Sequence, residues 1–187
     1  AHGLFYAPDP SSQTACTIGG NIATNSGGPH TLKNGVTTNH VLGYEMVLPD
    51  GTIEWLGVEP DGGEEVAGFD LRGAAIGSEG MFGVVTTVLV RLMKTPPTFK
   101  TFLCVFESVD DASQAVSGII AAGIVPAALE MMDQLITQAL EEAYHFGFPL
   151  DAGALLIVEL DGLAKGVEQQ AKQVDEICHR NNAREVR

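Results

Sequence analysis

The residue pattern of the chain changes near residue 95. Most of its 22 glycines lie before this point, in a region that reads as short strands joined by turns, whereas strand and helix patterns alternate after it. Two consecutive prolines follow Thr95, and prolines interrupt regular structure. We therefore predict an α+β protein with two regions, residues 1–96 and residues 97–187.

The first region predicts a small antiparallel sheet. Residues 41–48 and 52–56 are mostly apolar or β-branched, and they flank the turn sequence Pro-Asp-Gly at 49–51. Proline presets the first turn dihedral and glycine tolerates positive φ, so these residues predict a β-hairpin. A further β-branched run at 84–92 predicts another strand.

The second region alternates strand and helix patterns. The expected elements are a strand at 101–106, a helix capped by Asp110 or Asp111 that ends at Gly123, a strand at 127–131, a helix capped by Asp133 that ends near 146, a strand at 154–160 and a helix at 163–179. This order resembles a ferredoxin-like sandwich. Residues 183–187 look too few for its fourth strand, so we expect an incomplete sheet with one strand position empty.

Charge and cysteine content exclude several classes of protein. The chain has 24 acidic and 10 basic residues, a formal charge of −14 that would repel nucleic acid and anionic membrane surfaces. No apolar run approaches the ~20 residues that span a bilayer. The three cysteines lack CxxC spacing, which argues against a disulfide framework or a zinc site. A reducing, cytoplasmic location is the prediction.

The segment at 7–28 carries the densest chemical signal. Small and hydroxyl residues crowd around two Gly-Gly pairs in it. Glycines let a main chain approach a ligand closely, and Ser, Thr and Asn supply short donors and acceptors, as a pyrophosphate or a flavin ring edge requires. A glycine-rich loop that only braces a turn has the same composition, so both interpretations remain open at this point.

A second glycine cluster, at 77–83, leads into the strand predicted at 84–92. Its glycines are three residues apart, which differs from the GxGxxG fingerprint of dinucleotide-binding Rossmann folds, and no GxxxxGK[ST] sequence occurs in the chain. The nicotinamide and nucleotide-hydrolase interpretations therefore lose their main support.

Taken together, the motifs resemble one family. The runs are PDPSSQ, CTIGGNIATNSGG, VLGYEMVLPDG, GFDL and GSEGMFGVVT, in this order. They resemble the FAD-linked oxidases of the vanillyl-alcohol oxidase and p-cresol methylhydroxylase (PCMH) superfamily, especially its glycolate oxidase catalytic subunits and D-lactate dehydrogenases. The resemblance covers residues 3–95 closely and is looser beyond residue 98. It implies the C-terminal part of a PCMH-type FAD-binding domain at 1–96, then an incomplete ferredoxin-like substrate (cap) domain at 97–187, in a chain truncated at both ends.

The resemblance also assigns residues to the cofactor FAD, with backbone amides as the main contacts. The residues matched to the flavin and its ribityl-pyrophosphate chain are Pro10, Ser12, Cys16, Thr17, Gly19, Gly20, Asn21, Thr24, Gly27 and Gly28. A later segment, expected to close over the cofactor, supplies Glu79, Gly80, Gly83 and Val84. Met81 and Phe82 stand where the family usually has Thr-Leu, a change expected to alter local packing and not the binding mode.

The implied activity is oxidation of a 2-hydroxy acid, of the glycolate or D-lactate class, to the 2-keto acid by hydride transfer to flavin. The catalytic residues are unknown, because relatives supply their arginine and histidines from segments outside this chain, and the fragment alone is expected to be inactive. Two alternatives remain: a non-catalytic assembly subunit or remnant, and a related oxidase of another substrate class. A partner subunit or a homodimer is possible.

Other polar residues are weaker candidates. His30 and Lys33 follow the flavin segment, at positions where relatives carry basic or polar residues, so a role near the substrate is conceivable. The remaining histidines lack the spacing of metal ligands, and no metal is expected. Cys16 lies in the flavin motif, but no neighbouring His or Asp identifies it as a nucleophile.

Overall fold

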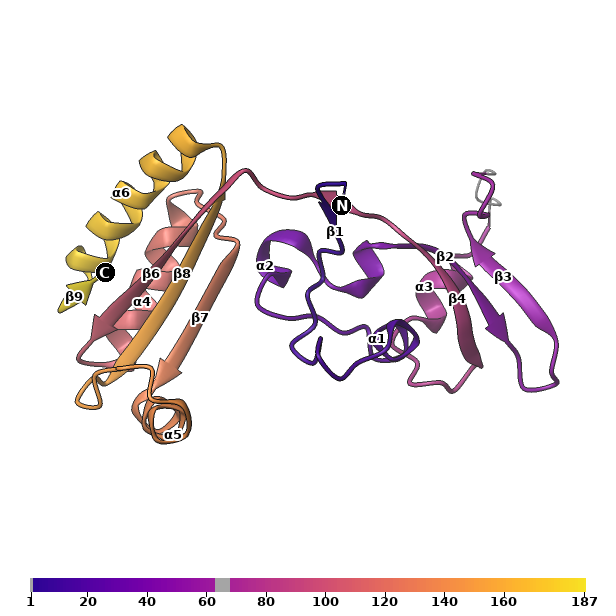
Figure 1. The fold of residues 1–187 in the computed structure, drawn as a ribbon, viewed down its shortest axis with the longest axis horizontal. Helices are drawn as coiled ribbons and strands as arrows, with labels where there is room; N and C mark the ends of the chain where they lie inside the picture. The colour runs from indigo at the N-terminus through magenta and orange to yellow at the C-terminus, as the bar shows by residue number, and fades with distance from the viewer. Residues whose placement is uncertain (1, 63–67) are drawn as a thin grey trace. The chain divides into compact units, whose positions relative to one another are not determined.

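The computed structural model describes residues 2–62 and 68–187. The chain divides into two compact units, Ala1–Thr95 and Pro96–Arg187 (Figure 1). Strand β5 (Met93–Lys94) ends just before this division and β6 (Thr98–Phe106) begins just after it. Pro96 and Pro97 therefore lie where regular structure is interrupted, as the sequence predicts.

An antiparallel sheet organises the first unit. Its strands lie in the order β3 (Ile53–Gly57), β2 (Val41–Val47) and β4 (Val84–Val90). The predicted hairpin is confirmed, since β2 pairs with β3 along its length. In the turn of this hairpin Gly51 has φ +85°, and the Asp50 carboxylate accepts a hydrogen bond from the Thr52 N–H at 2.9 Å. The turn chemistry thus fixes the register of the hairpin.

Helix α1 (Ile18–Thr24) packs against β4. The Thr17 hydroxyl caps it by accepting the Gly20 N–H at 3.1 Å, and Asn25 ends it in the left-handed conformation. Ile22 is fully buried in the core of the unit. The other buried members of this core are Val41, Tyr44, Met46, Ala75 and Ile76. The glycine-rich segment therefore rests on the sheet through one apolar side chain of a short helix.

Several short elements complete the first unit. They are β1 (Leu4–Phe5), α2 (Thr31–Asn34), the 3₁₀ turn η1 (Thr37–Asn39) and α3 (Leu71–Ala75). Strand β1 pairs with β5, so the first and last strands of the unit are neighbours. Elements of two to five residues carry no detectable hydrophobic period, which explains why the sequence pattern does not predict them.

Tyr44 links the sheet to α3. Its ring is fully buried, and its hydroxyl donates to the Arg72 carbonyl oxygen at 2.9 Å. Burial is the main cause that raises the pKa of Tyr44 to about 12. Because this pKa exceeds the unfolded value of about 10, the folded state holds the proton more tightly. The resulting stabilisation is complete below about pH 10 and is lost as the pH rises towards 12.

We expect the variant Tyr44→Phe to lose about 1 kcal/mol of unfolding free energy at pH 8, because the hydrogen bond from the phenol to the Arg72 carbonyl is lost. Between pH 8 and 11 the variant should lose less stability than the native chain, since it has no phenol to ionise. Urea unfolding followed by the fluorescence of Trp55, the single tryptophan of the chain, measures both quantities. An equal alkaline loss in the two proteins would contradict the assignment.

The second unit is a ferredoxin-like sandwich. Its antiparallel sheet has the order β7 (Ala128–Asp133), β8 (Ala154–Gly162), β6 and β9 (Glu185–Val186). Residues of α4 (Val109–Ala121) and α6 (Ala164–Arg180) share one core with alternate residues of β6 and β8. These two helices therefore cover one face of the sheet, and the strand and helix order matches the sequence prediction.

Two details of the second unit differ from prediction. Ser108, not Asp110 or Asp111, caps α4, because its hydroxyl accepts the Asp111 N–H at 3.1 Å. The expectation of an empty strand position is also wrong. Strand β9 occupies that position beside Cys104 and Val105 of β6, because α6 ends close enough for a two-residue strand to pair.

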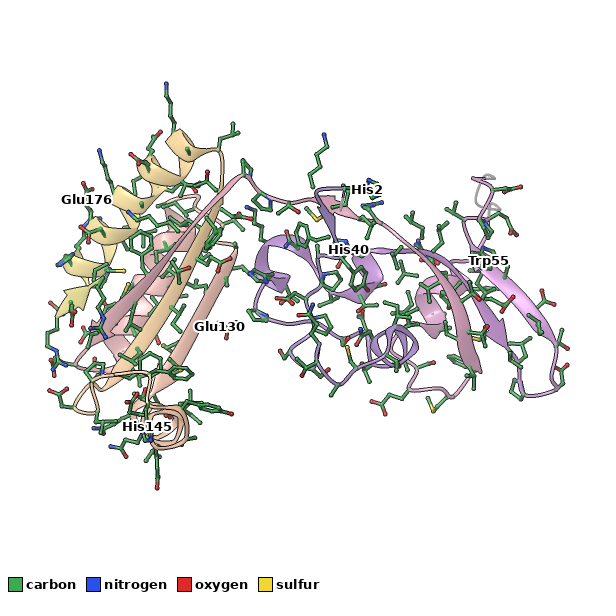
Figure 2. The ribbon with its side chains drawn as sticks, in the orientation of Figure 1. His2, His40, Trp55, Glu130, His145 and Glu176 are labelled. Carbon is green, nitrogen blue, oxygen red and sulfur yellow. The ribbon has the colours of Figure 1, made fainter. Side chains whose placement is uncertain are left out.

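The opposite face of this sheet is only partly covered. Leu155 and Val105 are buried on it with Ala152, whereas Phe99 is 73% exposed. Asp133 caps helix α5 (Gln134–Tyr144), as predicted, and His145 follows its last residue as the C-cap (Figure 2). Thr137 is the single buried residue that this helix shows.

Candidate cofactor-binding site

The two ends of the glycine-rich segment lie against each other. Asp9 adopts a left-handed conformation with φ +41°, and the Ser11 N–H donates to the Gly27 carbonyl at 3.4 Å. A Cβ atom on Gly28 would overlap the carbonyl oxygen of Asp9. Glycine at position 28 is therefore required for this close backbone approach.

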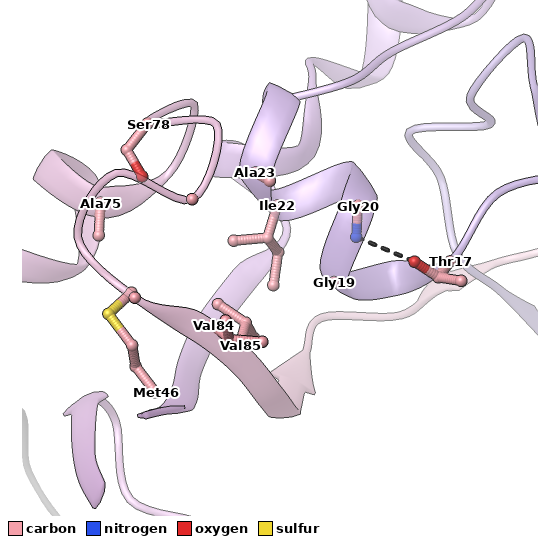
Figure 3. A pocket seen from close by; sticks show the side chains of 12 residues that line it. Thr17, Gly19, Gly20, Ile22, Ala23, Met46, Ala75, Ser78, Val84 and Val85 are labelled. Atoms are coloured by element: carbon pink, nitrogen blue, oxygen red, sulfur yellow. Dashed lines mark hydrogen bonds between the residues drawn. The ribbon is translucent and has the colours of Figure 1, made fainter. Parts of the chain in front are cut away.

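A first cavity, which we call the glycine cavity, has a volume of ≈ 270 Å³ (Figure 3). It lies between the first turn of α1, the start of β4 and the loop before β4. None of its described lining residues is charged. They are Thr17, Gly19, Gly20, Ile22, Ala23, Met46, Ala75, Ser78, Gly80, Gly83, Val84 and Val85.

Glycines let the backbone segments around the glycine cavity approach each other closely. A Cβ atom on Gly83 would lie 2.5 Å from the Val47 carbonyl oxygen, and one on Gly19 would lie 3.2 Å from that of Val85. Gly80 has φ +81°, which disfavours other residues. Main chain thus lines a cradle that larger residues at these positions would distort. An uncharged, glycine-lined cradle fits a ligand held mainly by backbone N–H groups, such as the pyrophosphate chain of FAD.

A second cavity, which we call the His30 cavity, has a volume of ≈ 430 Å³. Its lining combines aromatic and apolar side chains with amide, thiol, carboxylate and imidazole groups. The lining residues are Phe5, Tyr6, Asp9, Pro10, Gln13, Cys16, Asn21 and His30. Since Cys16 and Asn21 belong to the same segment as the α1 residues of the glycine cavity, both cavities border this helix.

Polar contacts within the His30 cavity are short and specific. His30 Nδ1 lies 2.7 Å from Asp9 Oδ2, and the two side chains are 28% and 30% exposed. Asn21 is only 5% exposed, and its side-chain nitrogen donates to Cys16 Sγ at 3.6 Å. Sulfur is a weak acceptor, so this buried carboxamide has a weak partner beside the cavity.

The structure divides the sequence-predicted site residues into three groups. Six line the glycine cavity, namely Thr17, Gly19, Gly20, Gly80, Gly83 and Val84. Three line the His30 cavity, namely Pro10, Cys16 and Asn21. Ser12, Thr24, Gly27, Gly28 and Glu79 line neither of these two cavities. Their roles in binding, like those of the other nine, stay predictions.

Sequence reasoning missed several lining residues. Met46 of β2 and Ala75 of α3 reach the glycine cavity only through the fold, and no local signal marks them. Asp9 stands inside the PDPSSQ run, so its position in a motif was a usable signal. Met81 and Phe82 are 78% and 52% exposed and line neither cavity.

Two kinds of feature are absent from the described part of the chain. In residues 2–62 and 68–187, no helix is both long and apolar enough to cross a membrane. Within the same residues, no group of three or more His, Cys, Asp or Glu side chains could hold a metal ion.

Family models match most of the chain. Residues 1–57 match the model described as "FAD binding domain", and residues 95–187 match "FAD linked oxidases, C-terminal domain". The glycolate oxidase subunit GlcD of Escherichia coli is 46% identical over 186 residues, which cover 100% of this chain and 37% of that protein. GlcD of Bacillus subtilis is 45% identical, over 97% of this chain and 38% of that protein. D-lactate dehydrogenase of Anaerostipes hadrus is 33% identical, over 75% of this chain and 29% of that protein.

Solved structures show the same fold. Alkyldihydroxyacetonephosphate synthase matches with a TM-score of 0.78 at 23% identity, over 97% of this chain and 35% of that chain. The p-cresol methylhydroxylase structure matches with a TM-score of 0.72 at 17% identity, over 98% of this chain and 40% of that chain. The chain therefore spans less than half the length of these relatives. It belongs to the family of FAD-linked oxidases.

Proposed function

We propose that the first unit holds FAD and that the whole protein oxidises a 2-hydroxy acid of the glycolate or D-lactate class. The observation that carries the proposal is the pair of cavities bordering α1, which nine of the motif residues line. The family models and the relatives support FAD as the cofactor. The names of the glycolate oxidase subunits and the D-lactate dehydrogenase support the substrate class.

The two cavities suggest how this chain would bind the cofactor. Backbone N–H groups near Gly19 and Gly80 would hold the pyrophosphate chain in the glycine cavity. The aromatic and amide groups of the His30 cavity would hold the ring system. When bound, the flavin ring supplies the chemistry by accepting a hydride from C2 of the hydroxy acid. The residues of this unit bind and orient the ring. Residues 97–187 are proposed as the substrate (cap) domain.

An FAD titration of the purified chain tests the proposal. We expect FAD to bind with quenching of its fluorescence and a resolved visible band, because the ring moves from water into a partly apolar cavity. Anaerobic addition of glycolate or D-lactate should leave this band unbleached if the chain alone is inactive, as the sequence predicts. A chain that fails to alter the FAD spectrum would overturn the assignment and favour the non-catalytic assembly subunit.

A partner subunit is the second part of the proposal. Helix α5 and the loop after it expose apolar side chains, with Leu135 75%, Tyr144 65% and Phe146 60% exposed. Exposed apolar patches often mark protein contacts. The E. coli relative is itself named a subunit. The solution mass of the chain, measured by light scattering, would separate a homodimer from a monomer that awaits another protein.

We also propose a cytoplasmic location. All three cysteines carry free thiols, and Sγ of Cys104 lies 3.6 Å from Sγ of Cys178 without a bond between them. Two buried thiols this close suit a reducing compartment.

A further inference from the structure

Asp9 and His30 are brought together by the backbone. They stand 21 residues apart in the sequence, and the approach of residues 9–11 to Gly27 and Gly28 places their side chains 2.7 Å apart. Asp9 has φ +41° and lies between Pro8 and Pro10. Because the proline rings restrict the backbone on both sides, the position of Asp9 is well defined. Asp9 therefore fixes the orientation of the His30 ring.

The cavity beside this pair has two kinds of wall. Phe5, Tyr6 and Pro10 contribute apolar surface, whereas Asn21 and His30 contribute polar groups. Its ≈ 430 Å³ volume far exceeds that of a two- or three-carbon acid and falls within the range of about 300–1,000 Å³ for small-ligand pockets. The lining thus suits a flat ring system with an apolar body and one polar edge, rather than a small anion.

We propose that the Asp9–His30 pair holds the polar edge of the flavin ring in the His30 cavity. This inference rests on the proposed FAD binding and extends it to two positioning residues outside the cofactor motif assignments. The edge in question carries the carbonyl and N–H groups of the ring. The imidazole of His30, oriented by the Asp9 carboxylate, hydrogen-bonds this edge, and the buried Asn21 carboxamide lies beside it.

The test compares FAD binding by the native chain with that of three variants. His30→Ala removes the imidazole. Asp9→Asn keeps the side-chain shape and tolerates the left-handed backbone, but removes the charge. His179→Ala is the matched control, because this histidine lies on α6 of the second unit with its side chain 53% exposed. Fluorescence gives the dissociation constant, and the visible absorption band reports the environment of the ring itself.

We expect His30→Ala to weaken FAD binding about 10-fold, the upper range for the loss of one hydrogen bond. The visible band should shift at the same time. Asp9→Asn should show a smaller change of the same kind, and His179→Ala should match the native chain. Circular dichroism checks that each variant is folded. If His30→Ala does not fold, Asp9→Asn alone tests the inference.

The outcomes separate two failures. No binding by the native chain overturns the proposed function and this inference with it. Native-like affinity and spectrum in both Asp9→Asn and folded His30→Ala overturn the inference alone. Weaker binding with an unchanged visible band also overturns it, because the pair would then contact another part of FAD.

Discussion

Gly28→Ala is expected to abolish FAD binding and to destabilise the first unit by about 3 kcal/mol. The added Cβ would overlap the Asp9 carbonyl oxygen and would lie 3.0 Å from the Ser11 nitrogen. Both neighbours are backbone atoms, so no side-chain rotation relieves the overlap, and the segment at 9–11 must move. That movement separates Asp9 from His30 and reshapes the His30 cavity.

Two measurements check this prediction. Urea unfolding followed by Trp55 fluorescence reports the first unit, which contains the single tryptophan. FAD titration reports the cavity. The control is Gly166→Ala in α6, where a Cβ meets nothing within 4 Å and alanine favours a helix by about 1 kcal/mol. Native-like FAD affinity in Gly28→Ala would show that the 9–11 segment does not shape the site.

Phe106→Ala is expected to reduce the unfolding free energy by about 3–5 kcal/mol, the range for truncating a buried aromatic residue. Phe106 lies at the end of β6, is fully buried and belongs to the core between the sheet and the helices α4 and α6. Its removal leaves a cavity that the surrounding helices and strands fill only partly.

Phe99 on the same strand provides a matched control. It is 73% exposed, so Phe99→Ala should change the unfolding free energy by less than about 1 kcal/mol. Urea unfolding of the two variants, followed by far-ultraviolet circular dichroism, gives the difference directly. Similar losses of unfolding free energy in both variants would mean that the exposed face of the sheet is covered in solution. The solution mass would then show whether a second copy of the chain covers it.

The larger elements of the fold could be predicted because local signals agree with packing. The Pro-Asp-Gly turn sets a hairpin register wherever it joins two apolar runs, and Asp133 caps α5 through the Ile136 N–H at 2.9 Å. The cap of α4 was misplaced because Ser108, Asp110 and Asp111 are all good capping residues. The backbone is still extended at Ser108, two residues after β6, and turns helical at Val109. The sequence pattern does not fix the residue at which this change occurs.

For the candidate site, the sequence identifies individual residues but not the contacts between them. The motif run identifies most residues near α1, since glycine and small polar residues are unusual at such density. It gives no indication that Gly28 serves a backbone contact with Asp9 instead of lining a cavity. The Asp9–His30 pair depends on that contact across 21 residues, so local pattern could not reveal it.

The ladder between β1 and β5 joins the two ends of the described first unit. Leu4 pairs with Lys94 and Phe5 with Met93, immediately before the division at Thr95. The backbone that leads into Pro96 is thereby held by two strands of the first unit. A change in the residues after Pro96 should therefore leave the β1–β5 register unchanged.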